Sequence, residues 1–323
     1  MKRIRQLAGF SKVPRPFFLA AGFFDGVHLG HQLIIRETVS RAREAGGESW
    51  VLTFDQHPLS VLAPDRAPAL LYPLEDRLSQ IESLGVDGTL ILPFTRSLAA
   101  ESPARFIDRL CGPLPQPLSK IWSEIRCGAN WRFGSRASGT PELLATLGER
   151  YHFRAVIAPY AEFKGEAISS TRIRQAIQSG NLADATAMLG RCFSVRGTVC
   201  RGRGVGAKQL ATATANLSTA DLPVLPPCGV YATEAQLTDG RRFHAVTDLG
   251  VHPTFHDKSV APLLETHLLD FQGDLYGQTI KLFFVARLRD EEVFPDAKAL
   301  QRQILTDIDQ ARRIFATHIL TCL

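Results

Sequence analysis

From about residue 16 to residue 160 the sequence alternates short apolar runs with longer stretches of helical character. In chain order these segments are "FFLAAG", "HQLIIRETVSRAREAGG", "SWVLTF", "PLEDRLSQIESLG" and "VDGTLILPF". Because parallel strands need a long connection, and a helix is the usual one, this alternation predicts parallel β-strands joined by helical crossovers. The fold class of this part is therefore α/β, with a doubly wound parallel sheet flanked by helices.

Beyond about residue 188 the pattern changes to short β-rich segments separated by Gly, Pro and Asp turns. They are "FSVRGTVC", "GVYATEAQL", "RFHAVTDLG", "LLETHLLDF" and "TIKLFFVARL", and "DAKALQRQILTDIDQARRIFATHIL" follows with helical periodicity. This pattern favours an antiparallel barrel or sandwich with a terminal helix. Two domains suit a chain of 323 residues, and we predict them to be residues 1–187 and 188–323.

Composition limits the partners that this chain can have. The 37 basic and 32 acidic side chains give a net charge of +5, spread without long blocks of one sign and without a basic stripe interleaved with aromatic residues. That balance favours anionic small molecules over nucleic acid. The six cysteines lie far apart and contain no CxxC pair, which indicates neither a zinc knuckle nor a disulfide scaffold. We expect a cytoplasmic protein with no membrane partner, acting as a monomer or weak homo-oligomer.

The segment "AAGFFDGVHLGH", residues 20–31, follows the first apolar run and contains two histidines. In a doubly wound sheet, ligands bind where strands end and helices begin. Gly22 and Gly26 let the backbone turn and let a nucleotide come close. His28 and His31 are three residues apart and so share one helix face, from which two imidazoles can donate hydrogen bonds to a phosphate. A metal-binding pair or two incidental surface histidines are the alternative interpretations.

A second helix start, "ISSTRIRQAI" at residues 168–177, is also suited to phosphate. Ser170 and Thr171 open the helix with hydroxyl groups, and Arg174 could reach the outer phosphates. Taken alone, a Ser/Thr run before a helix is most often a cap and such an arginine is most often solvated. Two phosphate-suited helix starts in one α/β domain favour a nucleotide site.

The two segments "GFFDGVHLGH" and "ISSTRIR" together resemble the nucleotidylyltransferase superfamily, and in particular the FMN adenylyltransferase half of the bifunctional riboflavin kinase/FAD synthetase family. Supporting matches are "LTFDQHP", "LGVDGTLILPFTRSLAAESPARFI" and "GANWRFGSRASG". The resemblance implies a Rossmann-like nucleotidylyltransferase domain. It also implies that the FMN phosphate attacks the α-phosphorus of ATP, so that pyrophosphate is released and FAD is formed.

By this resemblance, His28 and His31 would contact the ATP phosphates and Asn130 would help to hold the reacting nucleotide. The residues implied to bind ATP or its phosphates in this domain are Gly22, Phe24, Asp25, Gly26, Ser170, Thr171 and Arg174. Asp25 is equally suited to a structural role, in which it satisfies backbone N–H groups. Phe54 and Phe133 are expected to be packing residues rather than flavin contacts.

The second half of the chain resembles riboflavin kinase, a six-stranded barrel in this family. The matching segments include "LGRCFSVRGTVCRG", "LGVHPTF" and "LETHLLDFQGDLYGQTIKLFFVARLRDEEVF". The phosphate loop matches at "GAKQLATATAN", residues 206–216, where Gly206 and Lys208 would bind ATP phosphates and Thr214 and Asn216 would hold Mg²⁺. Glu265 matches the family's general base, which acts on the 5′-hydroxyl of riboflavin.

Several residues of the second half depart from the family pattern. In the phosphate loop the family's arginine is lost or displaced to Lys208, with one apparent extra residue, and Ala211 and Ala213 replace a glycine and a proline. Outside that loop, Asp248 replaces an asparagine and His252 an arginine. A lysine keeps a point charge for phosphate but loses the planar fork of arginine. Such changes suit either a specialised kinase or a disabled one.

The leading hypothesis is therefore a bifunctional enzyme of FAD biosynthesis, which uses ATP and Mg²⁺ with riboflavin, FMN and FAD as substrates or products. The alternative is an FMN adenylyltransferase whose impaired or inactive kinase barrel serves as a flavin-binding or structural module. A flavin-binding regulator without turnover is a third reading, and a nucleotidylyltransferase for another phosphorylated substrate is a fourth. The two phosphate sites argue against the third reading, and the attached kinase-like barrel argues against the fourth.

Overall fold

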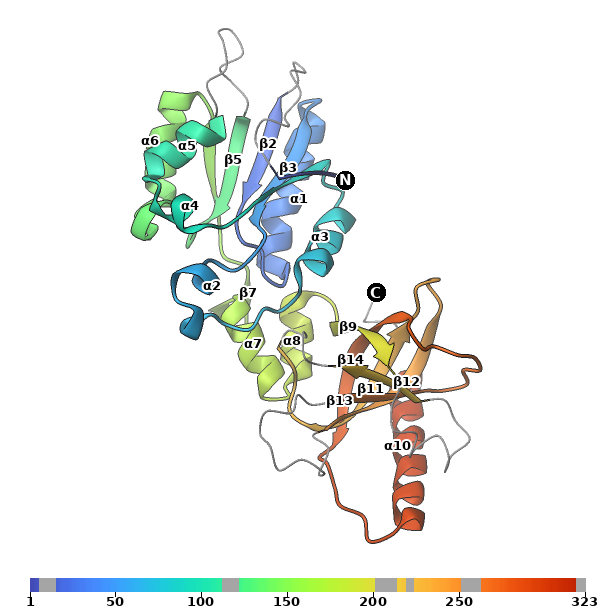
Figure 1. Cartoon of the computed structure of the whole chain (residues 1–323). Helices are drawn as coiled ribbons and strands as arrows, with labels where there is room; N and C mark the ends of the chain where they lie inside the picture. Colours follow the sequence, from blue (N-terminus) through green and yellow to red (C-terminus); the bar gives the residue numbers. More distant parts are fainter. Residues whose placement is uncertain (6–15, 112–121, 201–213, 219–223, 251–262, 318–323) are drawn as a thin grey trace. The chain divides into compact units, whose positions relative to one another are not determined.

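The computed structural model describes residues 1–5, 16–111, 122–200, 214–218, 224–250 and 263–317 (Figure 1). By their internal contacts the residues form two compact units, Met1–Ser170 and Thr171–Leu323. The division falls in helix α7 (Ser170–Gln178), which is followed by α8 (Leu182–Leu189). The domain ranges expected from the sequence, with a boundary at residue 187, stay a prediction.

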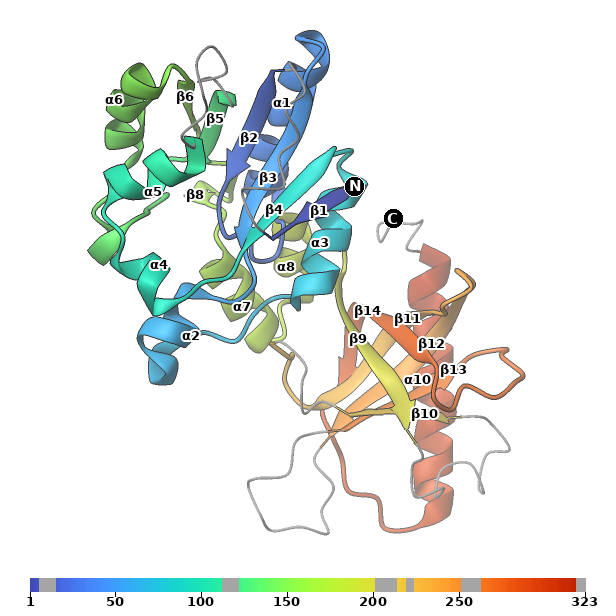
Figure 2. The same ribbon diagram turned by 45° about the horizontal axis from the view of Figure 1, so that its top comes forward.

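The first unit is built on a six-stranded parallel sheet, as the alternation of strands and helices predicts. Its strand order is β1-β4-β3-β2-β5-β6, which can be followed in Figure 2. The strands are β1 (Lys2–Ile4), β2 (Phe17–Ala21), β3 (Glu48–Phe54), β4 (Gly88–Leu92), β5 (Trp122–Gly128) and β6 (Arg154–Ala158). A two-stranded antiparallel pair, β7 (Glu162–Phe163) and β8 (Glu166–Ala167), follows β6.

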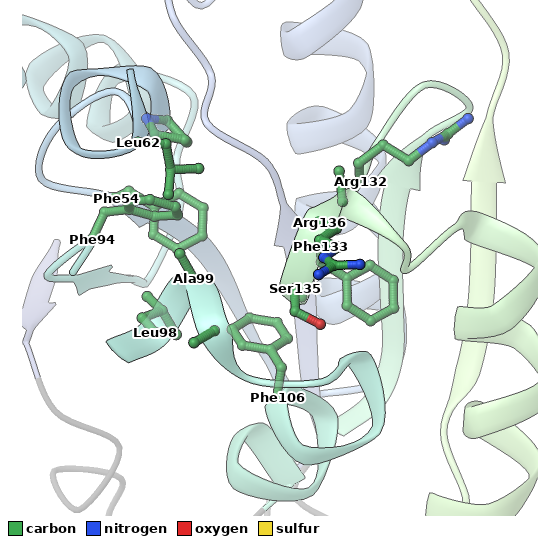
Figure 3. A pocket seen from close by; sticks show the side chains of 14 residues that line it. Phe54, Leu62, Phe94, Leu98, Ala99, Phe106, Arg132, Phe133, Ser135 and Arg136 are labelled. Atoms are coloured by element: carbon green, nitrogen blue, oxygen red, sulfur yellow. The ribbon is translucent and has the colours of Figure 1, made fainter. Parts of the chain in front are cut away.

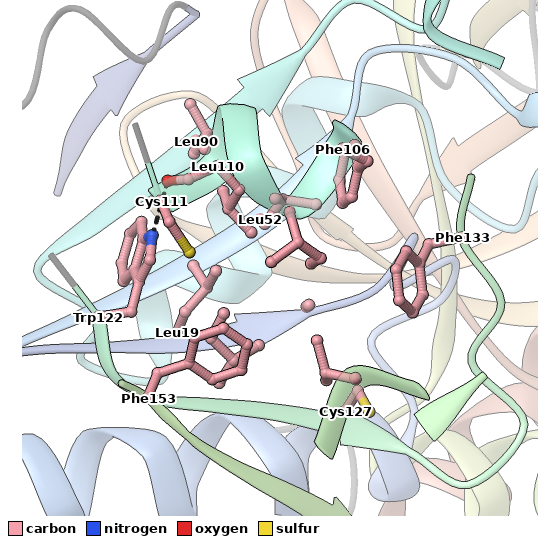
Figure 4. Close-up of a cluster of buried hydrophobic side chains, with 14 of the residues drawn as sticks. Leu19, Leu52, Leu90, Phe106, Leu110, Cys111, Trp122, Cys127, Phe133 and Phe153 are labelled. Carbon is pink, nitrogen blue, oxygen red and sulfur yellow. Dashed lines mark hydrogen bonds between the residues drawn. The ribbon is translucent and has the colours of Figure 1, made fainter. Parts of the chain in front are cut away.

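Hydrophobic side chains cover both faces of this sheet. Successive residues of a strand point to opposite faces, so Leu19 of β2 lies in one buried cluster with Trp122 and Phe106 (Figure 4), while Ala20 lies in the other with Ile35. The helices of this unit are α1 (Leu29–Glu44), α2 (Pro58–Leu62), α3 (Leu74–Ser83), α4 (Arg96–Ala100), α5 (Pro103–Cys111) and α6 (Pro141–Tyr151). Burial on both faces explains why the strands read as continuous apolar runs.

The strand order changes direction between β2 and β5. From β2 the chain moves through β3 to β4 on one side, and it returns to place β5 and β6 on the other side. In open α/β sheets the crevice at such a switch point, at the carboxyl ends of the strands, is where ligands bind. The segment containing His28 follows β2, and the turn containing Asn130 follows β5, so the fold brings both to this edge.

The second unit contains a closed six-stranded antiparallel barrel with strand order β10-β13-β12-β11-β14-β9. Its strands are β9 (Phe193–Cys200), β10 (Thr214–Ser218), β11 (Gly229–Gln236), β12 (Arg242–Gly250), β13 (Leu263–Leu268) and β14 (Thr279–Arg289). Closure removes the unpaired sheet edges that a sandwich would expose. The strand pattern alone left barrel and sandwich open, while the resemblance to riboflavin kinase implied a six-stranded barrel, and the structure confirms the barrel.

The terminal helix α10 (Ala297–Thr317) packs against the outside of the barrel. Ile308, Ile314 and Phe315 cover a cluster that includes Val230 of β11 and Val246 of β12. The Asp307 carboxylate accepts hydrogen bonds from Arg289 of β14, with an Nη2–Oδ2 distance of 2.9 Å. This buried ion pair fixes the helix to the barrel.

Two further observations bear on the sequence-based expectations. Cys192 is disulfide-bonded, a cross-link that the cysteine spacing did not indicate. In the described part of the chain, no helix combines the length and the apolar character needed to cross a membrane.

Candidate active sites

His28 and His31 lie together at the start of α1. Their rings stack with centroids 3.6 Å apart and planes 21° from parallel. His28 is the N-cap of the helix, and its Nδ1 accepts a hydrogen bond from the backbone N–H of His31 at 3.4 Å. Because Nδ1 is the acceptor, the proton of a neutral His28 ring is on Nε2. The pair therefore places an imidazole N–H donor at a helix N-terminus, whose partial positive charge favours phosphate.

The backbone before these histidines has an unusual conformation. Phe24, Gly26 and Val27 have φ angles of 59°, 85° and 39°, in the left-handed region that non-glycine residues seldom adopt. Such strain in a loop is typical of functional sites, where the surrounding structure holds it in place. Gly22 is needed for a different reason, because a Cβ atom there would lie 2.9 Å from the Phe24 ring.

Asp25 has its carboxylate directed at the protein backbone. Its two oxygens accept from the backbone N–H of Leu71 at 3.0 and 3.2 Å, and the side chain is only 3% exposed. These contacts match the structural role that the sequence left open for Asp25, and phosphate contact by this residue stays a prediction. The Ser170 hydroxyl donates to the Asp25 carbonyl at 2.9 Å. The start of the second helix therefore contacts residues 20–31, the histidine segment.

The remaining phosphate residues of the first domain are placed differently. Asn130 is exposed in the turn after β5, at the same sheet edge as the histidines. Thr171 and Arg174 follow Ser170 in α7 but belong to the second compact unit. Their contact with ATP phosphates stays a prediction.

An apolar cavity of about 660 Å³ lies in the first unit (Figure 3). Its walls come from the end of β3, from α2, α4 and α5, and from the loop after β5. They are formed by Phe54, Pro58, Leu62, Phe94, Leu98, Ala99, Ala100, Phe106, Arg132, Phe133, Gly134, Ser135, Arg136 and Ala137. Cavities of this size with aromatic walls are typical small-molecule sites.

Phe54 and Phe133, which we expected only to pack, both line this cavity. Phe133 also belongs to the hydrophobic cluster beside the sheet, where it stacks on Trp131 with ring centroids 4.6 Å apart. The packing role and the lining role are therefore compatible. The signal in the sequence was the position of Phe54 at the end of a predicted strand, where ligand-binding residues gather, whereas Phe133 lies further along a loop and gave no such signal.

The loop that closes one side of the cavity is held in a strained conformation. Arg136 and Ala137 have φ angles of 54° and 55°. Gly134 has a φ of 69°, and a Cβ atom on it would lie 2.7 Å from the Pro103 backbone nitrogen. The close approach to α5 and the left-handed residues give this wall a defined shape without a ligand.

A second cluster of polar residues lies on neighbouring barrel strands. Glu265 of β13 is directly opposite Asn216 of β10 on one side and Asp248 of β12 on the other. Side chains at directly opposed positions point to the same face of the sheet. The Asn216 side chain is 5% exposed, and its Oδ1 atom has no hydrogen-bond partner within the described ranges. The barrel therefore brings an available amide oxygen to the strand position beside the predicted general base.

The other residues expected in the kinase site cannot be placed in the same way. Gly206 and Lys208 lie outside the described residues, as do Ala211, Ala213 and His252. Thr214 is the first residue of β10, but its side chain is outside the described part. Their roles stay predictions.

Asp248 sits in an acidic environment. Burial, followed by the nearby Glu291 and Glu265 carboxylates, raises its pKa from the ordinary value of 3.8 to about 6, against the opposing effect of Arg289. Its Oδ1 is buried without a hydrogen-bond partner in the described part of the chain. The charged form of Asp248 is therefore disfavoured in the folded barrel.

We expect Asp248→Asn to stabilise the barrel, and to do so more at high pH. Since the folded pKa is above the unfolded one, wild-type stability falls as the pH rises toward about 6, and the isosteric amide removes that cost. The gain in unfolding free energy should increase by about 1 kcal/mol between about pH 5 and about pH 8. Urea unfolding at both pH values measures it, with the exposed Asp309→Asn as control. A gain in unfolding free energy that is the same at both pH values would contradict the raised pKa of Asp248.

Two protein-family models match the chain. The model described as FAD synthetase matches residues 11–172, and the model described as riboflavin kinase matches residues 189–315. The first range covers the parallel sheet with the histidine segment, and the second covers the barrel.

Curated proteins named bifunctional riboflavin kinase/FMN adenylyltransferase match almost the whole chain. The protein of Bacillus subtilis (strain 168) is 33% identical over 300 residues, which are 92% of this chain and 92% of the relative. The protein of Pseudomonas fluorescens is 34% identical over 316 residues, 98% of each chain. A crystal structure described as a macrolide-efflux protein from Streptococcus pneumoniae has a TM-score of 0.81 at 27% identity, covering 96% of this chain and 98% of that one.

Fold, sites and matches together define a two-domain transferase, with an adenylyltransferase domain followed by a kinase domain. The chain belongs to the bifunctional riboflavin kinase/FMN adenylyltransferase family.

Proposed function

We propose that this chain makes FAD from riboflavin in two transfers from ATP. The barrel transfers a phosphoryl group to riboflavin and forms FMN. The parallel-sheet domain then transfers the adenylyl group of a second ATP to FMN, which yields FAD and pyrophosphate. The observation that supports this most strongly is that one chain carries both the stacked histidine pair at a helix N-terminus and the paired Asn216 and Glu265 on the barrel.

In the adenylyl transfer, the protein's task is to position two phosphates and to stabilise charge. The attacking FMN phosphate is already anionic, so no protein nucleophile is needed. The Nε2–H group of His28, together with His31 and the helix N-terminus, is suited to donate to oxygens of the α-phosphate as negative charge grows there. The isoalloxazine ring of FMN suits the cavity, where Phe54 and Phe133 offer aromatic faces.

In the kinase step, Glu265 accepts the proton of the riboflavin 5′-hydroxyl as that oxygen attacks the γ-phosphorus of ATP. Mg²⁺ would come with ATP, and it supplies neutralisation of the phosphate charge. The residues suit it, because Mg²⁺ prefers oxygen ligands and the Oδ1 atom of Asn216 is buried without a partner in the described part of the chain. Thr214, Gly206 and Lys208 complete the expected ATP contacts of this domain.

In adenylyl transfer, Asn130 would help to hold the reacting nucleotide. Ser170, Thr171 and Arg174 would hold the triphosphate. The partners are the small molecules ATP, riboflavin and FMN, with no nucleic acid or membrane. We expect the chain to act in the cytoplasm, as a monomer or weak homo-oligomer.

A pair of parallel incubations tests the proposal. The purified protein is given ATP and Mg²⁺ with riboflavin in one tube and with FMN in the other, and the flavins are separated by chromatography. The expected result is FAD in both tubes, with FMN appearing transiently in the first. FAD from FMN alone would mean that the barrel is not a kinase, and absence of FAD from both would overturn the proposal.

A further inference from the structure

Arg77 of α3 is a buried charged residue to which the two transfers assign no role. Its side chain is fully buried, and two of its three guanidinium nitrogens donate to backbone carbonyls, whereas Nε has no hydrogen-bond partner in the described part of the chain. Nη1 donates to the Phe23 carbonyl at 3.1 Å, and Nη2 donates to the Phe54 carbonyl at 2.5 Å. The guanidinium also lies over the Phe23 ring, with Cζ 4.2 Å from its centroid. One side chain therefore joins the segment that follows β2 to the last residue of β3.

These two carbonyls belong to the two parts of the proposed adenylyl-transfer site. Phe23 is followed directly by the left-handed Phe24, and this segment leads to His28. The Phe23 carbonyl also accepts from the Thr53 hydroxyl at 2.8 Å, so its position is fixed from two sides. Phe54 places its own side chain in the wall of the cavity. Arg77 thus bridges residues 23–31, which we call the phosphate segment, and the apolar cavity lined by Phe54, which we call the flavin cavity.

Arginine is suited to this bridge in a way that lysine is not. Its planar fork holds two donors in a fixed relation, whereas a lysine ammonium is a single point on a flexible stem. Burial lowers the pKa of Arg77 to about 10, while the nearby Asp25 and Asp55 carboxylates oppose that shift, so the group stays charged at neutral pH.

We propose that Arg77 is a positioning residue for adenylyl transfer, which fixes the phosphate segment relative to the flavin cavity. This inference depends on the proposed function, since it assigns ATP to the segment and FMN to the cavity. Transfer requires the FMN phosphate to approach the α-phosphorus in line, and a displacement of about 1 Å can cost about 100-fold in rate. Loosening the bridge should therefore affect the rate of the chemical step more than the binding of either substrate.

The test uses Arg77→Lys and Arg77→Met in the full chain. The kcat of FAD formation from FMN and ATP is measured by chromatography, and the Kd values of FMN and of a non-hydrolysable ATP analogue are measured by calorimetry. We expect kcat to fall about 30-fold in Arg77→Lys and further in Arg77→Met, with each Kd within about threefold of wild type. Riboflavin phosphorylation by the barrel of the same molecules should be unchanged and reports the amount of protein with a folded barrel, while the unchanged Kd values show that the first domain is folded.

A matched control separates positioning from stability. Trp122 donates from Nε1 to the Leu110 carbonyl at 3.0 Å, at the opposite end of the same sheet, so Trp122→Phe removes a buried side-chain bond away from the site. The inference is overturned if kcat per folded molecule in Arg77→Lys stays within about twofold of wild type, or falls only as it does in Trp122→Phe. If Arg77→Met does not fold, the kcat of Arg77→Lys still tests the inference. Failure of the proposed function is distinct, because wild type itself would then make no FAD.

Discussion

Replacing His28 with alanine is expected to lower FAD formation from FMN and ATP by about two to three orders of magnitude. The reason is that His28 presents an N–H donor at the N-terminus of α1, where charge develops on the α-phosphate, and the loss of one such preorganised donor has effects of this size. Chromatographic assay of FAD at saturating FMN and ATP measures the change. The ring also caps α1, so thermal unfolding is followed in the same preparation.

Two controls show whether the loss of activity in His28→Ala is specific to adenylyl transfer. Riboflavin phosphorylation by the same molecules should remain at the wild-type rate, because Glu265 and Asn216 belong to the other unit. His152→Asn replaces an exposed histidine that ends α6 in a left-handed conformation, which asparagine tolerates, and should leave FAD formation unchanged. A His28→Ala enzyme with near-normal FAD formation would remove the histidine pair from the mechanism.

Glu265→Gln is expected to lower riboflavin phosphorylation by about two to four orders of magnitude while FMN adenylylation continues. The amide has nearly the shape of the carboxylate but cannot accept the proton of the 5′-hydroxyl. FMN formation from riboflavin and FAD formation from added FMN are measured on one preparation. Glu234→Gln changes a carboxylate of β11 that is ion-paired with Arg242 in the same barrel, and it should keep kinase activity. Equal loss in both variants would show that the barrel only needs its charges to fold.

Much of the fold could be predicted because it is encoded locally. The alternation of apolar and amphipathic stretches indicated the parallel sheet, and the helical stretch expected from His31 onward lies in α1, which begins at Leu29. The choice between barrel and sandwich was not local, since it depends on the pairing of β9 with β10 and of β10 with β13. Such long-range pairing leaves no pattern within a single segment.

The site was predictable where its residues are close in sequence. The face shared by His28 and His31 follows from helix geometry, and the stacked rings agree with it. The cavity was not predicted, because its walls come from segments between residues 54 and 137 that only the tertiary fold brings together. Arg77 was missed for another reason: in the segment "PLEDRLSQIESLG" it reads as one charge among several on a solvated helix face, yet it is fully buried.

Phosphorus NMR of the reaction with riboflavin shows whether one chain carries out two different transfers from ATP. Phosphoryl transfer at the barrel releases ADP, and adenylyl transfer at the parallel-sheet domain releases pyrophosphate. We predict that wild-type protein with riboflavin, ATP and Mg²⁺ forms one ADP and one pyrophosphate for each FAD. Pyrophosphate and FAD that appear only when FMN is supplied, with no ADP from riboflavin, would contradict the claim.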